Sequence, residues 1–107
     1  MNHTIQLFVD MAVDPAKEQE MLRHFETVFR PAAKRFEGFI DVKMLKLRSA
    51  LVGSAPAGVN YRFALNYESE ELRQKWICSD IHGEVWGKME NMLSSPNYTV
   101  LLFDVAA

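Results

Sequence analysis

Cysteine is almost absent from this 107-residue sequence, which contains a single one, Cys78. One cysteine cannot form an internal disulfide, and the sequence has no CxxC pair and no Cys/His cluster spaced like zinc ligands. No GxGxxG, P-loop or GxSxG motif occurs either. We therefore expect a protein of a reducing, cytoplasmic setting that needs neither a metal ion nor a bound cofactor.

Long apolar runs and an excess of basic charge are also missing. The longest unbroken apolar run near either end covers residues 100–103, far short of a membrane span, and residues 1–10 lack the pattern of a signal peptide. Twelve Lys and Arg residues against fourteen Asp and Glu residues give a net charge of -2, without the basic excess that nucleic-acid binding requires. We expect the protein to bind neither membranes nor nucleic acids.

The sequence does contain enough apolar material for one compact core. Hydrophobic residues make up 49% of the chain and charged residues 24%, a balance that excludes a disordered chain. A chain of this length can bury roughly two thirds of the surface that it exposes when unfolded. We expect a single domain over residues 1–107.

The first third of the chain predicts a strand followed by a long helix. Apolar residues alternate over residues 4–13, which is the period of a strand with one strongly apolar face. Asp14 and Pro15 fit a helix N-cap and a first helical position, and apolar residues then recur at helical spacing as far as Gly38. Pro31 lies inside this pattern without shifting its phase, so we expect one kinked helix.

A hairpin is expected next. Residues 39–51 are long for a strand and lose their alternation at residues 46–48, where we expect a bend or bulge. Residues 53–58 are small and turn-forming, and alternating apolar residues resume at residues 61–67.

The last third predicts helices broken once and then a strand. Ser69 can cap a helix with acidic residues in its first turn, and Asp80 can cap a second one that runs to about Leu93. Pro96 ends the helical region, and residues 98–105 fit a strand that is buried on both faces.

The element order is therefore β-α-β-β-α-β, the plan of an α+β ferredoxin-like domain with helices on one face of an antiparallel sheet. Several strands are apolar on both faces, and leaving the second face in water would expose a larger apolar patch than monomers normally tolerate. We expect a homodimer that forms through the helix-free sheet face.

Residues 67–86 read YESEELRQKWICSDIHGEVW, and with the EGF of residues 37–39 and the DPAKE after the first strand the chain resembles the antibiotic biosynthesis monooxygenase (ABM) family. The likeness covers nearly the whole chain through loose local motifs. It implies a dimeric α/β barrel, in which two ferredoxin-like sheets pack face to face and each protomer has a pocket between its helices and its sheet. Some members oxidise phenols or quinols without a cofactor, and some degrade haem.

The resemblance transfers few of the family's functional residues. Polyketide-oxidising members have an Asn and a Trp that orient the substrate phenol, and the matching positions are Phe63 and Tyr67. Haem-degrading members have a Trp that matches Trp76, but their iron-ligating His falls at Trp86 and their first-strand Asn at about Val9. The resemblance therefore argues against a haem protein.

His82 is the candidate catalytic residue. It matches the His of a Ser-x-x-His element in quinol-oxidising members, and it recurs with Trp86, Met89 and Leu93 on one helix face. Burial there would keep the imidazole neutral near pH 7, ready to accept a proton from a phenol or quinol. The structural alternative is a histidine that bonds Ser79 or a backbone carbonyl.

Aromatic residues around His82 are the candidate substrate-binding residues. Trp76 and Trp86 could flank a flat ligand, although aromatic residues at helical spacing also form ordinary cores. Tyr61, Phe63 and Tyr67 share one strand face, and a buried tyrosine hydroxyl there needs a partner, which a ligand oxygen could provide.

Two functions follow from these residues. The first is a cofactor-independent monooxygenase that acts on a phenolic or quinol-type small aromatic molecule, with His82 as the base. The second is a non-catalytic dimeric module that binds a small hydrophobic ligand, a function favoured by the missing Asn and Trp. A haem-binding protein is the weakest reading, because of Trp86.

Overall fold

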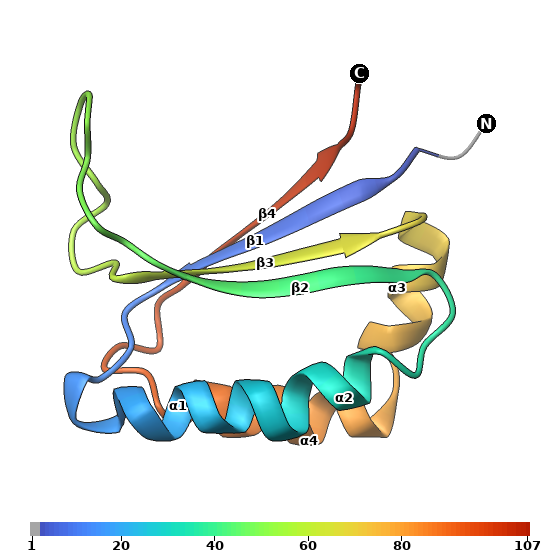
Figure 1. The fold of residues 1–107 in the computed structure, drawn as a ribbon, viewed down its shortest axis with the longest axis horizontal. Helices are drawn as coiled ribbons and strands as arrows, with labels where there is room; N and C mark the ends of the chain where they lie inside the picture. The colour runs from blue at the N-terminus through green and yellow to red at the C-terminus, as the bar shows by residue number, and fades with distance from the viewer. Residues whose placement is uncertain (1–2) are drawn as a thin grey trace.

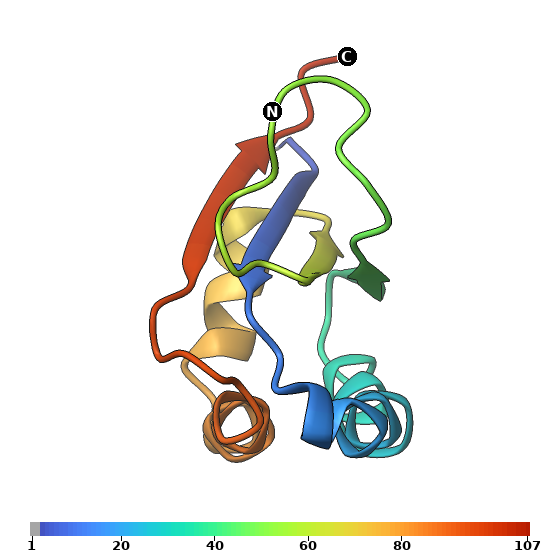
Figure 2. The ribbon, with the colours of Figure 1, turned by 90° about the vertical axis from the view of Figure 1, so that its left-hand side faces the viewer.

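The computed structural model describes residues 3–107 as one antiparallel sheet with its helices on a single face (Figure 1). The elements in chain order are β1 (Ile5–Met11), the 3-10 turn η1 (Pro15–Lys17), α1 (Glu18–His24), the π-helical turn η2 (Phe25–Phe29), α2 (Arg30–Ala33), β2 (Phe39–Lys46), β3 (Tyr61–Tyr67), α3 (Glu70–Ile77), α4 (Asp80–Glu90) and β4 (Thr99–Asp104). The end-on view shows α1 and α4 side by side beneath the sheet (Figure 2).

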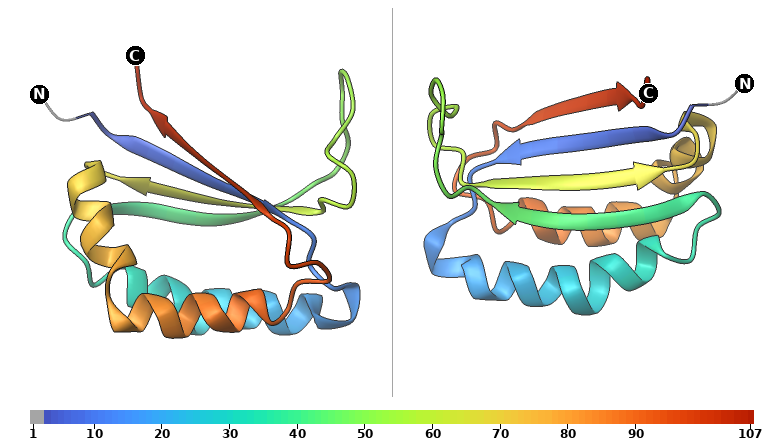
Figure 3. Two further views of the ribbon diagram at one scale, coloured as in Figure 1. Left: turned by 180° about the vertical axis from the view of Figure 1, so that it is seen from behind. Right: turned by 45° about the horizontal axis from the view of Figure 1, so that its top comes forward.

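The sheet has the strand order β2-β3-β1-β4, and every neighbouring pair is antiparallel. The four strands lie side by side when the sheet is seen from its helix-free side (Figure 3). This order, with helices returning along one face, confirms the predicted α+β ferredoxin-like fold. Within residues 3–107 no helix is long and apolar enough to cross a membrane.

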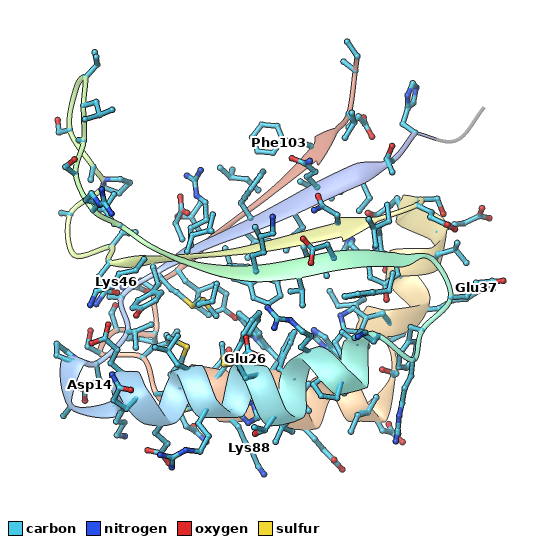
Figure 4. The ribbon with its side chains drawn as sticks, in the orientation of Figure 1. Asp14, Glu26, Glu37, Lys46, Lys88 and Phe103 are labelled. Carbon is cyan, nitrogen blue, oxygen red and sulfur yellow. The ribbon has the colours of Figure 1, made fainter. Side chains whose placement is uncertain are left out.

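Strand alternation separates the two faces of the sheet. The residues of β1 and β3 that point toward the helices form the centre of the core: Ile5, Leu7, Val9, Met11, Tyr61, Phe63, Leu65 and Tyr67. The register places the intervening residues on the opposite face, here called the open face: Gln6, Phe8, Asp10, Asp41, Lys43, Leu45, Arg62, Ala64, Asn66, Thr99, Leu101 and Phe103. Figure 4 shows Phe103 pointing away from the helices.

The long first helix forms as predicted but ends earlier. Asp14 caps it, because its carboxylate accepts a hydrogen bond of 2.9 Å from the Ala16 amide. Pro31 has no N–H to donate, and the helix accommodates it with the π-helical turn η2 directly before it, so the chain stays helical as far as α2. A turn over residues 34–38 then leads to Gly38 at φ +91°, which shortens the helix relative to the expected end.

Three local predictions need correction. Strand β2 ends at Lys46, and its irregularity lies at Phe39/Asp41 rather than at residues 46–48. The cap of α4 is Ser79, whose hydroxyl accepts from the His82 amide, whereas Asp80 lies in the first turn of the helix.

The prediction that β4 is buried on both faces is wrong for the single chain. Val100, Leu101, Leu102 and Phe103 are 51%, 41%, 47% and 50% exposed. The physical reason is position: β4 is an edge strand, so it lacks a neighbour on one side. On its helix-facing side, Val100 and Leu102 line a cavity and are not closed in by packed side chains.

Candidate functional site

A pocket lies between the helical layer and the β4 side of the sheet. Its cavity volume is about 400 Å³, within the range of small-molecule sites in proteins. The lining residues come from β1, β3, β4 and the residue before β4, and from the helical segments: Leu7, Val9, Phe29, Phe63, Leu65, Arg73, Trp76, Ile77, His82, Trp86, Tyr98, Val100 and Leu102. Most of these side chains are apolar, so the cavity suits a small hydrophobic or aromatic molecule.

His82 reaches the pocket from the first turn of α4. The ring of His82 meets the ring of Trp76 edge to face, with 5.0 Å between the ring centroids. Burial lowers the pKa of His82 below its usual value, the positive charge of Arg73 lowers it further, and Glu90 opposes both. The imidazole is therefore neutral at pH 7 and has a nitrogen that can accept a proton.

The environments of His82 and His24 differ in one decisive respect. Nε2 of the buried His24 donates a 2.9 Å hydrogen bond to the Val85 carbonyl, so this ring fixes α1 against α4. The expected partner of the His82 ring was Ser79, but the Ser79 hydroxyl donates to the Trp76 carbonyl and accepts from the backbone amide of His82. Among residues 3–107 we find no hydrogen bond to the ring nitrogens of His82, so the alternative in which Ser79 or a carbonyl holds the imidazole is not what the structure shows.

The two tryptophans differ in how deeply they are buried. Trp76 is almost fully buried and packs edge to face against Phe29 and Phe36, so it belongs to the core as well as to the pocket wall. Trp86 is partly buried, and its indole Nε1 donates a 3.3 Å bond to the hydroxyl of Tyr98. Both predicted roles, packing and pocket lining, are therefore combined in these residues.

The three aromatic residues of β3 do not lie together at the pocket. Phe63 lines the pocket and meets the ring of Trp86 at 5.6 Å between centroids. Tyr61 lies at the start of β3, where its hydroxyl donates a 2.6 Å bond to Glu18, away from the cavity. Tyr67 lies at the end of β3 and packs edge to face against Phe39, with its hydroxyl buried.

Two polar lining residues escaped the sequence analysis. Arg73 could have been found from the sequence, since it lies one helical turn before Trp76 and so shares the same helix face. Tyr98 could not have been found in this way, because it belongs to no helix. It lies directly before β4, where the chain returns to the sheet edge, and it lines the pocket there. Its hydroxyl donates a 2.8 Å bond to Glu90, which links that edge to α4.

No group of three or more His, Cys, Asp and Glu side chains in the described part of the chain is arranged to hold a metal ion. The lone Cys78 is exposed. The polar groups available for chemistry in the pocket are therefore His82, Arg73 and Tyr98.

By sequence, the chain matches no protein-family model and no curated protein. Its fold, by contrast, is shared by many solved structures. The "putative antibiotic biosynthesis monooxygenase" of Caulobacter crescentus aligns with a TM-score of 0.78 and 17% identity, over 99% of this chain and 92% of that one. SnoaB of Streptomyces nogalater, a cofactor-independent oxygenase, aligns with a TM-score of 0.76 and 11% identity, over 98% and 95% of the two chains.

A third neighbour is a dimeric ferredoxin-like protein of unknown function from Jannaschia, with a TM-score of 0.78 and 10% identity over 95% of this chain and 99% of that one. At these identities the alignments show the fold. The chain therefore shares the ferredoxin-like fold of these structures, two of which are named antibiotic biosynthesis monooxygenases, and this is the fold that its sequence motifs predicted.

Proposed function

We propose that the protein is a cofactor-independent monooxygenase of a phenolic or quinol-type small aromatic molecule, with His82 as its general base. One observation carries the proposal. The His82 imidazole is held neutral by burial at the wall of an apolar cavity, and its ring nitrogens have no hydrogen bond from residues 3–107. A neutral ring in that position is suited to accept the proton of a bound hydroxyl.

The reaction balances without a cofactor when the substrate supplies the electrons. The phenol gives its proton to His82, and the resulting phenolate donates electron density to a ring carbon that forms a C–O bond with dioxygen. The peroxide on that carbon then loses its O–O bond as the C–H proton and the proton from His82 leave with one oxygen as water. A phenol plus dioxygen thus becomes a quinone plus water. An apolar cavity supports this chemistry because it excludes bulk water from the reactive intermediates.

The aromatic wall supports an aromatic substrate. Trp76, Trp86 and Phe63 face the cavity, and ring-edge and ring-face contacts of this kind bind flat molecules with defined geometry. The positions of Tyr61 and Tyr67 within the chain give no support to a role for either in this pocket.

The test is oxygen uptake with a panel of naphthols and quinols, measured against a protein-free blank that corrects for autoxidation. His82→Gln should reduce the protein-dependent rate by roughly 10² to 10⁴, the usual contribution of a general base. His24→Gln is the matched control, since it changes a histidine outside the cavity. A panel without any protein-dependent uptake, or equal rates for the wild type and His82→Gln, would reject the proposal.

A non-catalytic ligand-binding module is the second candidate, and Phe63 favours it. The resemblance expects an amide-bearing side chain at this position, and the structure has a phenyl ring at the pocket wall instead. Binding of naphthols without oxygen uptake would select this function. A Soret band on addition of haem would select a haem-binding protein.

We further propose that the protein forms a homodimer through the open face. The apolar side chains of Phe8, Leu101 and Phe103 lie there, and Phe8 and Phe103 meet edge to face. Residues 47–60 rise from the same side of the sheet and carry Leu51 and Val52, which are 92% and 95% exposed (Figure 1). The Jannaschia protein, which shares the fold, is described as dimeric, and this supports homodimerisation.

Light scattering after size-exclusion chromatography tests the dimer. Phe103→Asp should yield monomers, whereas Leu102→Asp, a control of similar exposure on the other face of β4, should remain dimeric. A monomeric wild type, or a dimeric Phe103→Asp protein, would contradict this interface.

A further inference from the structure

Arg73 has an unusual location for a charged side chain, at the wall of an apolar pocket. It is only 7% exposed, and it lines the cavity beside Trp76 and His82. A buried guanidinium requires partners, because each unpaired donor has lost its hydration without a replacement.

Glu70 satisfies only one edge of this guanidinium. Nε of Arg73 donates to Oε2 of Glu70 at 2.8 Å, and Nη2 donates to Oε1 at 2.6 Å. These two bonds form the usual fork between an arginine and a carboxylate. Nη1 has no acceptor among residues 3–107 and is not one of the fully buried atoms without a partner, so its N–H donors remain for a ligand.

The two charged groups of the Arg73–Glu70 pair are not equally exposed to water. The Glu70 side chain is 38% exposed and the Arg73 side chain 8%, so water screens the carboxylate more than the guanidinium. The positive charge of Arg73 is accordingly felt at His82, where it contributes to the lowered pKa. An anion in the cavity would therefore meet a positive field and an available N–H donor.

We propose that Arg73 is the anion-binding residue of this pocket and that the natural ligand is an aromatic molecule with an ionised oxygen, a phenolate or a ring-borne carboxylate. The inference rests on the pocket of the proposed function but needs no oxygen chemistry. If the ligand is the phenol that His82 deprotonates, Nη1 holds the phenolate oxygen while the proton is on the imidazole.

The test compares 2-naphthoate with 2-naphthamide, which share a ring system and differ in charge. Calorimetry without turnover should show that the wild type binds the naphthoate about tenfold to a hundredfold more tightly, the effect of one hydrogen bond to a charged group. Arg73→Gln should abolish this preference. Lys75→Gln is the matched control, because it removes the same charge from an exposed position of the same helix and should retain the preference.

Glu70→Gln provides a test of opposite sign that does not depend on the stability of Arg73→Gln. Removal of the carboxylate leaves the guanidinium uncompensated, so binding of naphthoate should become tighter and binding of naphthamide should stay unchanged. A spectrophotometric titration of bound 2-naphthol identifies the source of the oxyanion, since a phenolate ligand predicts a naphthol pKa that is lowered in the wild type and restored in Arg73→Gln.

Equal binding of the two probes by the wild type, binding of neither, or no tightening in Glu70→Gln would overturn the proposal. These outcomes are separate from the oxygen-uptake test. A protein that prefers naphthoate but consumes no oxygen keeps the anion site and loses the monooxygenase function, and a His82-dependent oxygenase without charge preference does the reverse.

Discussion

Two tyrosines on the same strand offer a matched test of the energetics of this core. Tyr67 and Tyr61 lie at opposite ends of β3, face the helices, and are 0% and 2% exposed. The hydroxyl of Tyr61 donates to Glu18 at 2.6 Å, whereas the hydroxyl of Tyr67 has no hydrogen-bond partner in the described chain. Burial raises the pKa of each to about 12, so both hydroxyls are protonated at pH 7.

Removal of each hydroxyl should therefore have effects of opposite sign. A buried hydroxyl without a partner costs about 1 to 3 kcal/mol, and Tyr67→Phe removes that cost while it keeps the ring in place. We expect the free energy of unfolding to rise by about 1 kcal/mol, which corresponds to roughly 4 to 8 °C in Tm for a domain of this size. Tyr61→Phe removes a hydrogen bond to a carboxylate and should lower Tm.

Thermal and urea unfolding at pH 7, followed by circular dichroism, measure both variants against the wild type. Equal urea m-values for the three proteins would show that the comparison concerns stability and not compactness. A Tyr67→Phe protein less stable than the wild type would refute the reasoning, because it would show that an internal water molecule or a ligand bonds the hydroxyl.

Three further predictions concern stability and pH. His24→Ala leaves the buried Val85 carbonyl without its donor and should cost about 1 to 3 kcal/mol in urea unfolding, whereas His82→Ala should cost less and mainly affect ligands. Because the folded chain holds the pKa of His82 below that of the unfolded chain, the unfolded state binds more protons below about pH 6.5. Stability should thus fall as the pH drops through that range, and less so in His82→Gln, as Tm measured against pH would show. Gly38→Ala should cost about 1 to 3 kcal/mol, since φ is +91° and the new Cβ would lie 2.6 Å from Leu72 Cδ1.

The sequence predicts the strands of the sheet centre well because one signal dominates there. In β1 and β3 every second residue is buried against the helices, and a one-residue shift would turn that whole apolar set into water. The ends of elements depend on contacts that alternation does not encode. The helix stops at Ala33 because the chain must turn through Gly38 to start β2, and no change in apolar spacing marks this point.

Strand β4 is a case in which the apolar pattern alone does not show where the strand lies in the sheet. Its four consecutive apolar residues resemble a strand in the middle of a sheet, since burial on both faces produces such runs. The strand is instead at the sheet edge. Its residues Val100 and Leu102 line the pocket, whereas Leu101 and Phe103 belong to the open face. A run of apolar residues indicates surfaces to be covered, and it does not say whether the chain itself, a ligand or a second subunit covers them.

Helical spacing identified the part of the pocket wall that α4 provides. His82, Trp86 and Met89 do share one face of α4, with Met89 in the core and the two larger rings at the cavity. Spacing alone could not separate His82 from His24, because both lie near apolar helical stripes. The two histidines differ because the ring of His24 bonds the Val85 carbonyl on the facing helix, a contact between residues 61 positions apart.

The break between α3 and α4 explains why this pocket has a histidine at its wall. Ser79 sits at the break, donates to the Trp76 carbonyl at 2.6 Å, and accepts from the His82 amide at 3.3 Å. One hydroxyl thus ends α3, begins α4, and fixes the positions from which the two rings meet edge to face. An unbroken helix would place residues six apart at angles of about 600°, on faces well separated from each other. The Ser-x-x-His element therefore has a structural meaning apart from catalysis: the serine turns the chain so that a histidine shares a wall with the tryptophan of the preceding helix.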